Sequence, residues 1–171
     1  LIEKLPNVTI KTSFFATDLI IENGHCLGLK GFDEKGEPTI IEAKATVLAT
    51  GGSGQVFGVT SNPFVSTGDG VAMAIRSNVA LQNMKYIQFH PTAMFEPRKS
   101  QAFLITEAIR GYGAHILNSN GERFLFEVHK NGELATRDVV SKAISEQMKK
   151  ENGKNVWLDL RHLPIEDFKN K

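Results

Sequence analysis

The chain has 171 residues, of which 41% are hydrophobic and 23% charged, and its formal net charge at pH 7 is +1. This composition is typical of a globular protein with one domain or two small ones, and the mixed charges argue against a nucleic-acid-binding surface. A single cysteine, Cys26, excludes an internal disulfide framework, and no apolar run reaches the length of a membrane-spanning helix.

The first part of the chain predicts an antiparallel β-meander. Several short runs alternate between apolar and polar residues, which is the period of a β-strand. The strands are expected at residues 8–12, 16–22, 26–30 and 39–42. Asn23 and Gly24 lie between two of these runs, and Asn-Gly is typical of a two-residue hairpin turn.

Residues 45–52 are expected to form a buried parallel strand that ends in small residues. Ligands bind at the carboxyl ends of such strands, where small side chains let them reach the backbone. The candidate cofactor-binding residues are therefore Ala49, Thr50, Gly51 and Gly52. A tight turn that requires glycine would explain the same residues.

The glycines at residues 52–58 resemble a dinucleotide-binding fingerprint, but that motif requires a helix to begin at the glycines. The β-prone residues that follow, and Pro63 after them, argue against such a helix. A helix is expected instead from about residue 69, with Thr67 or Asp69 as its N-cap and residues 71, 74, 75 and 78 on one face. Asp69 could cap this helix or hydrogen-bond the hydroxyl groups of a cofactor.

The most distinctive stretch is Gln-Phe-His-Pro-Thr at residues 88–92. We expect a strand at 86–90 that ends at His90, because Pro91 restricts the preceding residue to an extended backbone. This rigid setting favours His90 as a ligand-binding or catalytic residue. A purely structural histidine is the alternative.

Further polar groups follow within twenty residues of the histidine. Thr106 and Glu107 begin a short segment that continues to Arg110. They could complete a site with His90, or Glu107 and Arg110 could form an ordinary ion pair at a helix end.

The last third of the chain predicts a hairpin, a helix and a strand, at residues 114–126, 136–152 and 155–160. Asn120 and Gly121 form the expected turn of the hairpin. Thr136 is the expected cap of the helix, whose apolar stripe comprises residues 139, 140, 143, 144 and 148.

Arg137 conflicts with its position at the start of this helix, where the helix dipole disfavours a cation. A cation held there can bind an anion together with the backbone N–H groups, so Arg137 is a candidate site residue. A solvent-exposed arginine of little consequence is the alternative. The histidines show no metal-ligand spacing, and no metal site is expected.

Both ends of the sequence have helix signals. Residues 1–5 resemble the last turn of a helix that stops at Pro6, and Pro164 resembles the first turn of another. We therefore expect the chain to be an internal fragment of a longer protein.

Five ordered motifs together resemble the succinate dehydrogenase, fumarate reductase and L-aspartate oxidase flavoproteins. They are Ala-Thr-Gly-Gly at 49–52, Thr-Gly-Asp-Gly at 67–70, Gln-Phe-His-Pro-Thr at 88–92, Thr-Glu-Ala-Ile-Arg-Gly at 106–111 and Arg-Asp-Val-Val at 137–140. Their order and approximate spacing agree over nearly the whole chain. Within the family, the stretches at 103–108, 131–138 and 157–162 are most similar to the L-aspartate oxidases.

The resemblance implies a fold of the α+β or α/β class in two parts. Residues 1–80 would be part of a two-dinucleotide-binding-type FAD domain, with the antiparallel meander plus the parallel strand. Residues 81–171 would be a mixed α+β capping domain, truncated at its C-terminal end, that closes over the flavin. FAD would lie beside the turn at 49–52 and contact Asp69.

The resemblance also implies a reaction. His90, Thr106 and Glu107 would bind the carboxylate side of the substrate, and Arg137 would be the catalytic proton donor or acceptor. L-Aspartate would be oxidised to iminoaspartate, with a hydride passing from its α-carbon to the flavin. Oxygen or fumarate would reoxidise the flavin, and quinolinate synthase would be a partner in quinolinate and NAD biosynthesis in the bacterial cytoplasm.

Two alternatives remain open: a fragment of a fumarate reductase or succinate dehydrogenase flavoprotein, and a non-catalytic binding module on the same fold. Lys85 and Tyr112 stand where relatives usually have glutamate, so negative charge is lost near the cap. The family's glycine-rich FAD loop and the downstream histidine and arginine of its substrate clamp are missing. The fragment alone is therefore expected to bind FAD weakly or not at all and to be inactive.

Overall fold

The computed structural model describes residues 4–97 and 99–164, and it divides into two compact units. The first unit comprises Leu1–Val56 and Phe64–Met84, and the second comprises Phe57–Pro63 and Lys85–Lys171. The helix ends expected at the two termini involve residues 1–3 and 165–171, which lie outside the described residues. Within the described ranges, no helix is long and apolar enough to cross a membrane.

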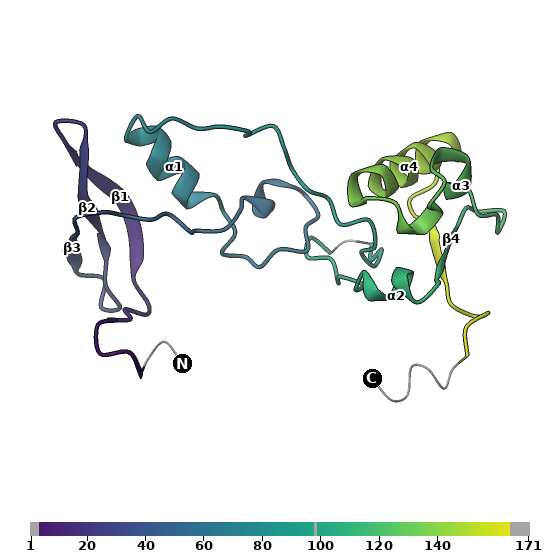
Figure 1. Cartoon of the computed structure of the whole chain (residues 1–171), viewed down its shortest axis with the longest axis horizontal. Helices are drawn as coiled ribbons and strands as arrows, with labels where there is room; N and C mark the ends of the chain where they lie inside the picture. The colour runs from purple at the N-terminus through teal and green to yellow at the C-terminus, as the bar shows by residue number, and fades with distance from the viewer. Residues whose placement is uncertain (1–3, 98, 165–171) are drawn as a thin grey trace. The chain divides into compact units, whose positions relative to one another are not determined.

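The first unit contains a three-stranded antiparallel sheet in the order β1-β2-β3 (Figure 1). Its strands are β1 (Phe15–Glu22), β2 (His25–Phe32) and β3 (Pro38–Glu42). Asn23 and Gly24 have φ angles of 50° and 79°, which the tight turn between β1 and β2 requires. The predicted meander is confirmed from residue 16 onwards, but the strand expected at 8–12 was wrong, since these residues are not paired.

The parallel strand expected at residues 45–52 is not formed. A strand requires neighbours that share its backbone hydrogen bonds, and no described residue pairs with this segment. Its apolar side chains are consequently open to solvent, with Val47 88% exposed. A short run of apolar residues predicted the strand. The strand does not form because no described segment supplies the backbone hydrogen bonds.

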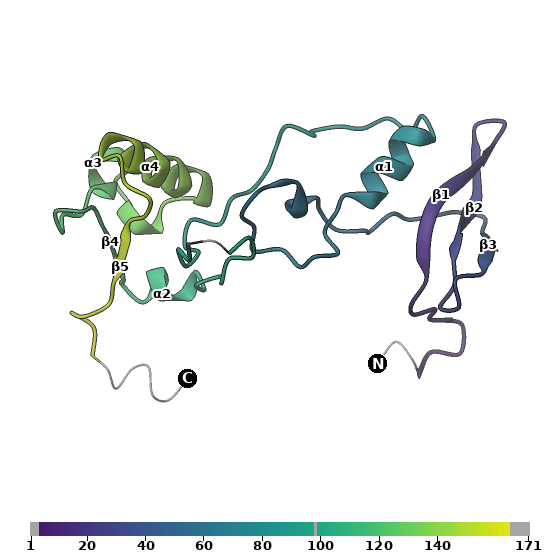
Figure 2. The same cartoon turned by 180° about the vertical axis from the view of Figure 1, so that it is seen from behind.

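Helix α1 (Asp69–Arg76) lies beside β1 in the first unit, as both opposite views show (Figures 1 and 2). Arg76 Nε donates a hydrogen bond of 2.8 Å to Asp18 Oδ1 on β1. The predicted caps were wrong, because the N-cap is Gly68 in a left-handed conformation with φ 82°. The predicted face was also shifted: the residues buried beside the sheet are Met73 and Ala74.

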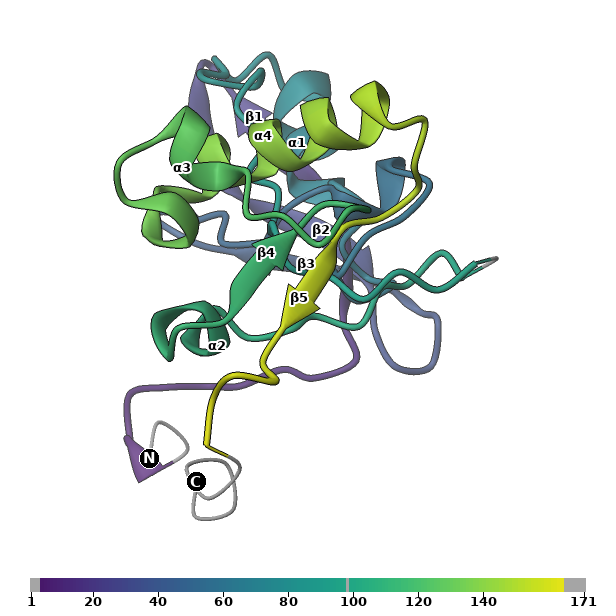
Figure 3. The ribbon, with the colours of Figure 1, turned by 90° about the vertical axis from the view of Figure 1, so that its right-hand side faces the viewer.

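The second unit has a two-stranded antiparallel sheet, with the longest helix on one side of it and a short helix just before its first strand (Figure 3). Its elements are α2 (Ala108–Gly111), β4 (His115–Leu117), α3 (Leu125–Val128), the 3-10 turn η3 (Gly132–Leu134), α4 (Arg137–Lys150) and β5 (Trp157–Asp159). The core gathers apolar residues from β4, α3 and α4, namely Ile116, Phe124, Leu125, Ala135, Val140, Ala143 and Ile144. The predicted apolar stripe of α4 is confirmed, since all its members are buried or pack against this core.

The hairpin expected at 114–126 forms only in its turn and in one antiparallel bridge beside it, between Leu117 and Arg123. Asn118 Oδ1 accepts hydrogen bonds from the N–H groups of Asn120 and Glu122, at 3.0 and 2.9 Å, and so closes the turn. Beyond the turn the chain enters α3 instead of a strand, because Leu125 is almost completely buried there. The strand that pairs with β4 is β5, about forty residues later in the chain.

The segment at 86–90 is also not a strand. Nearby, isolated bridges pair Ala93 with Leu104 and Thr60 with Gln101. The second bridge attaches residues 57–63 to the second unit, although the 3-10 turn η2 (Gly54–Val56) just before them belongs to the first.

Candidate active site

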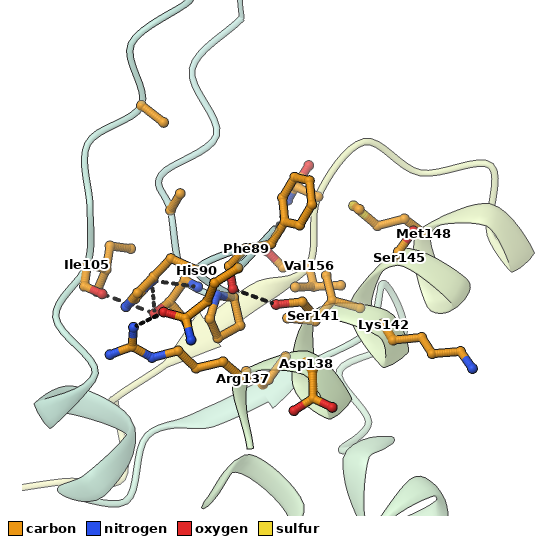
Figure 4. A pocket seen from close by; sticks show the side chains of 18 of the residues that line it. Phe89, His90, Ile105, Arg137, Asp138, Ser141, Lys142, Ser145, Met148 and Val156 are labelled. Atoms are coloured by element: carbon orange, nitrogen blue, oxygen red, sulfur yellow. Dashed lines mark hydrogen bonds between the residues drawn. The ribbon is translucent and has the colours of Figure 1, made fainter. Parts of the chain in front are cut away.

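The second unit contains a cleft of about 1560 Å³ lined by residues 85–95, one side of α4 and the strand β5. Three of the predicted site residues line it, and they are His90, Glu107 and Arg137. Figure 4 shows the Arg137 side chain running alongside His90, whereas Asp138 points the other way. Residues separated by 47 positions in the sequence therefore meet in one cleft.

Arg137 is the first residue of α4, and its guanidinium is held on two edges. Nε and Nη2 donate to Glu107 Oε2 at 2.8 and 2.6 Å, and Nη1 donates to Gln88 Oε1 at 2.9 Å. The Glu107 carboxylate offsets the conflict between a cation and the positive end of the helix. Three of the five N–H bonds of the guanidinium are used by described residues, which leaves one on each terminal nitrogen for a ligand.

Glu107 connects two arginines. Its Oε1 accepts a hydrogen bond of 2.9 Å from Arg110, while its Oε2 holds Arg137. The hydrogen bonds from Arg137, reinforced by the charges of both arginines, lower the pKa of Glu107, so the carboxylate stays ionised. Arg110 is only 2% exposed, and its Nη1 is fixed by the backbone carbonyl of Glu133 at 2.6 Å. The expected pair between Glu107 and Arg110 is thus present as part of the same site.

His90 is half-buried and is oriented by the residue two positions later. Its Nδ1 accepts a hydrogen bond of 3.3 Å from the backbone N–H of Thr92. Because Nδ1 is the acceptor, the proton of the neutral ring lies on Nε2, which can donate to a ligand oxygen. Burial, and then the charge of Arg137, lower the pKa of His90, so the ring is neutral at pH 7. The Thr92 hydroxyl donates to Ile105 O at 3.0 Å and anchors this arrangement.

Thr106 takes a different position from the other candidates. Its hydroxyl accepts a hydrogen bond of 3.3 Å from the backbone N–H of Ala108 at the start of α2, and it does not line the cleft. Its expected contact with a substrate stays a prediction.

Two residues of the cleft were not selected from the sequence. Gln88 accepts from Arg137, and Ser141 Oγ donates to the backbone carbonyl of Phe89 at 3.2 Å (Figure 4). Gln88 lies two residues before His90, and Ser141 lies one helical turn after Arg137. These spacings were the available signals, since they place each residue on the same side as a predicted site residue.

The first unit holds the predicted cofactor residues 49–52 in an exposed loop against the start of α1. A Cβ on Gly70 would come within 1.9 Å of Thr50 Oγ1, so the Thr50 side chain lies directly against the backbone of the helix at Gly70. Gly51 has a φ angle of 73°, and both Gly51 and Gly52 face open space. Asp69 accepts a hydrogen bond of 2.9 Å from Thr67 at the same helix end.

These features fit an extended ligand such as FAD. The two glycines let a ligand reach the backbone, and the neighbouring helix begins with its N–H groups unpaired. The buried hydroxyl oxygen of Thr46, in the same segment, has no hydrogen-bond partner among the described residues. Among all the residues that the structure describes, no group of three or more His, Cys, Asp or Glu side chains could hold a metal ion.

A family model described as an FAD binding domain matches residues 1–171, the whole chain. The chain belongs to this FAD-binding family. It therefore has the flavoprotein fold, with mixed sheets and helices, and FAD is the cofactor of the full-length protein.

The curated relatives divide between two activities. The chain is 47% identical over 165 residues to an L-aspartate oxidase of Nostoc sp., covering 93% of this chain and 28% of the relative. It is 44% identical over 160 residues to one chain of the fumarate reductase (CoM/CoB) of Methanothermobacter marburgensis, covering 91% and 29%. The chain thus spans less than a third of the length of these relatives.

Solved structures of a fumarate reductase and of an Sdh1 complex are also similar to the chain. A structure of E. coli quinol fumarate reductase is similar with a TM-score of 0.84 and 34% identity, over 92% of this chain and 29% of that one. A Mycobacterium smegmatis Sdh1 complex is similar with a TM-score of 0.66 and 41% identity, over 91% and 27%.

Proposed function

We propose that the chain is part of an FAD-dependent L-aspartate oxidase, in which the second unit is the capping domain and its cleft binds the substrate. The observation that carries the proposal is the Arg137 guanidinium, held by Glu107 and Gln88 beside the Nε2–H of His90. Two free N–H donors on a cation, next to a neutral imidazole donor, suit the carboxylate of a small diacid. Identities of 40–47% to L-aspartate oxidases support aspartate as that diacid.

Oxidation of L-aspartate to iminoaspartate removes a hydride from the α-carbon and a proton from the amino group. Bound FAD supplies the two-electron acceptor. The residues of this chain bind the carboxylate through His90 and Arg137 and orient the α-carbon. Arg137 would take the amino proton while it gives one of its own N–H protons to Glu107, which is hydrogen-bonded to the other edge of the guanidinium. Oxygen or fumarate would then complete the cycle, and the product would enter quinolinate and NAD biosynthesis in the cytoplasm.

A fumarate reductase or succinate dehydrogenase flavoprotein is the second candidate. It is favoured by the 44% identity to the M. marburgensis fumarate reductase chain and by the similarity to the E. coli enzyme. Both reactions handle a four-carbon diacid, so the cation and the imidazole of the cleft suit either one.

Steady-state assays of the full-length protein separate the two candidates. The protein is supplied with L-aspartate and either oxygen or fumarate, and in parallel with succinate and an artificial electron acceptor. An L-aspartate oxidase releases ammonia and oxaloacetate, since iminoaspartate hydrolyses in water. Turnover of succinate with no turnover of L-aspartate would overturn the proposal in favour of the second candidate.

A further inference from the structure

The segment that carries His90 is attached to the second unit in an unusual way. Within the described ranges, residues 85–91 form no backbone–backbone hydrogen bond, so no sheet fixes their position. Two side chains of α4 hold the segment instead. Arg137 Nη1 donates to Gln88 Oε1 at 2.9 Å, and Ser141 Oγ donates to Phe89 O at 3.2 Å.

The two donors occupy one side of the helix. Arg137 and Ser141 are four residues apart on α4, which places them one above the other on the same face. Their acceptors, Gln88 and Phe89, are consecutive and immediately precede His90. The helix that presents the guanidinium therefore also fixes the residues leading to the imidazole (Figure 4).

The other side of His90 is already fixed. Pro91 restricts its backbone, and Thr92 holds Nδ1 from a loop that is anchored to Ile105. The position of the imidazole relative to Arg137 then depends on whether the preceding residues stay against α4. Small displacements at such a site are costly, since a ligand carboxylate must reach both donors at hydrogen-bond distance.

We infer that Ser141 and Gln88 are positioning residues, which set the separation between His90 and the Arg137 guanidinium and thereby the affinity for the dicarboxylate. This inference rests on the proposed function, since it assumes that a diacid binds in the cleft. Neither residue needs to touch the substrate. Gln88 suits the role because its neutral amide can hold the guanidinium and leave the positive charge available to the ligand. A second carboxylate in its place would neutralise that charge.

The test uses the full-length flavoprotein with Ser141→Ala and the control Ser119→Ala. Ser119 is an exposed serine of the second unit that does not line the cleft. The readouts are the dissociation constant of succinate and of L-aspartate, measured by the change in flavin absorbance, and kcat and KM for the substrate that turns over. Ser141→Thr keeps a hydroxyl and serves as the rescue variant.

Ser141→Ala is expected to weaken diacid binding and raise KM about three- to tenfold, as for one lost hydrogen bond, with kcat changed less than about twofold. Ser141→Thr and Ser119→Ala should stay near wild type. Gln88→Leu combined with Ser141→Ala should weaken binding by more than the product of the single effects, because each remaining contact partly compensates for the loss of the other.

A second readout separates positioning from a general loss of packing. The charged groups facing His90 are Arg137, Arg110 and Glu107, and burial together with Arg137 lowers its pKa. If the segment moves away from α4, the acidic limb of kcat/KM against pH should move to higher pH in Ser141→Ala and not in Ser119→Ala.

The outcomes are distinct. If wild-type protein binds neither diacid, the proposed function fails. If wild type binds them and Ser141→Ala binds equally well, or loses no more than Ser119→Ala does, the positioning role is wrong and the proposed function stands.

Discussion

Glu107 Oε2 accepts two hydrogen bonds from the Arg137 guanidinium, at 2.8 Å from Nε and 2.6 Å from Nη2. The pair joins the residue just before α2 to the first residue of α4, thirty positions later in the sequence. The other carboxylate oxygen of Glu107 accepts a hydrogen bond from Arg110, which is buried. Glu107 is therefore placed to orient a cation, and its own oxygens are occupied before any substrate arrives.

Replacing Glu107 by Gln tests this positioning role. The variant keeps the shape of the side chain but removes the charge that offsets Arg137 at the helix N-terminus, so the guanidinium should lose its fixed orientation. We expect kcat/KM for the diacid to fall roughly 10- to 100-fold in the full-length enzyme. Glu146→Gln on the exposed face of α4 is the control, since Glu146 only approaches Lys142 at 3.9 Å. Equal activities of the two variants would contradict the role.

Gly51→Ala tests whether the exposed loop of the first unit contacts FAD. Both Gly51 and Gly36 have positive φ angles, of 73° and 79°, and a Cβ at either position meets open space. The two substitutions therefore cost the same backbone strain, about 1 kcal/mol. Only Gly51→Ala should lower the flavin content of the purified full-length protein, measured as the ratio of absorbance at the flavin and protein bands. Equal flavin content in both variants would show that the cofactor lies elsewhere.

His90 should make stability depend on pH. Burial and the Arg137 charge lower its pKa below the usual value of about 6.5, so the folded protein binds the proton more weakly than the unfolded chain. The contribution of neutral His90 to the free energy of unfolding is fully present above pH 6.5. It is lost as the pH falls through the pKa of His90 in the folded protein. His115, whose pKa burial also lowers, contributes in the same window.

We therefore expect the temperature at the midpoint of thermal unfolding to decrease as the pH is lowered from 7.5 to 5.5. The decrease should be smaller in His90→Asn, in which an amide oxygen can still accept from Thr92 but does not titrate. The carboxylates of the site titrate below this range. The same decrease in wild type and in His90→Asn would contradict the assignment.

Local signals in the sequence predicted much of the fold. Asn23 and Gly24 specified a turn that their φ angles confirm, and the apolar stripe of α4 specified both the helix and its buried face. In each case the deciding interactions lie within a few residues. Predictions of strands were wrong where the pairing partner is distant in the sequence. Residues 45–52 have no pairing partner in the described chain, and β4 pairs with β5 and, apart from one bridge, not with the second arm of the predicted hairpin.

The roles of the predicted site residues stay predictions, but their positions can be compared with the structure. Residue type and the family motifs indicated His90, Glu107 and Arg137, which do line one cleft. The sequence could not show that Arg137 and Ser141 of α4 hold Gln88 and Phe89, because these residue types carry no signal of a particular partner. Such contacts depend on the approach of α4 to residues about fifty positions earlier.

In the proposed reaction Arg137 acts directly on a diacid in this cleft. The decisive measurement is the rate at which L-aspartate bleaches the flavin of the full-length holoenzyme without oxygen, in wild type, in Arg137→Ala and in the control Arg161→Ala. Arg161 lies in the same unit but is 86% exposed and pairs with Asp159. We expect Arg137→Ala to reduce the rate about 10²- to 10⁴-fold, as for the loss of a proton-transfer group, and Arg161→Ala to leave it unchanged. A rate in Arg137→Ala within threefold of wild type would contradict the claim.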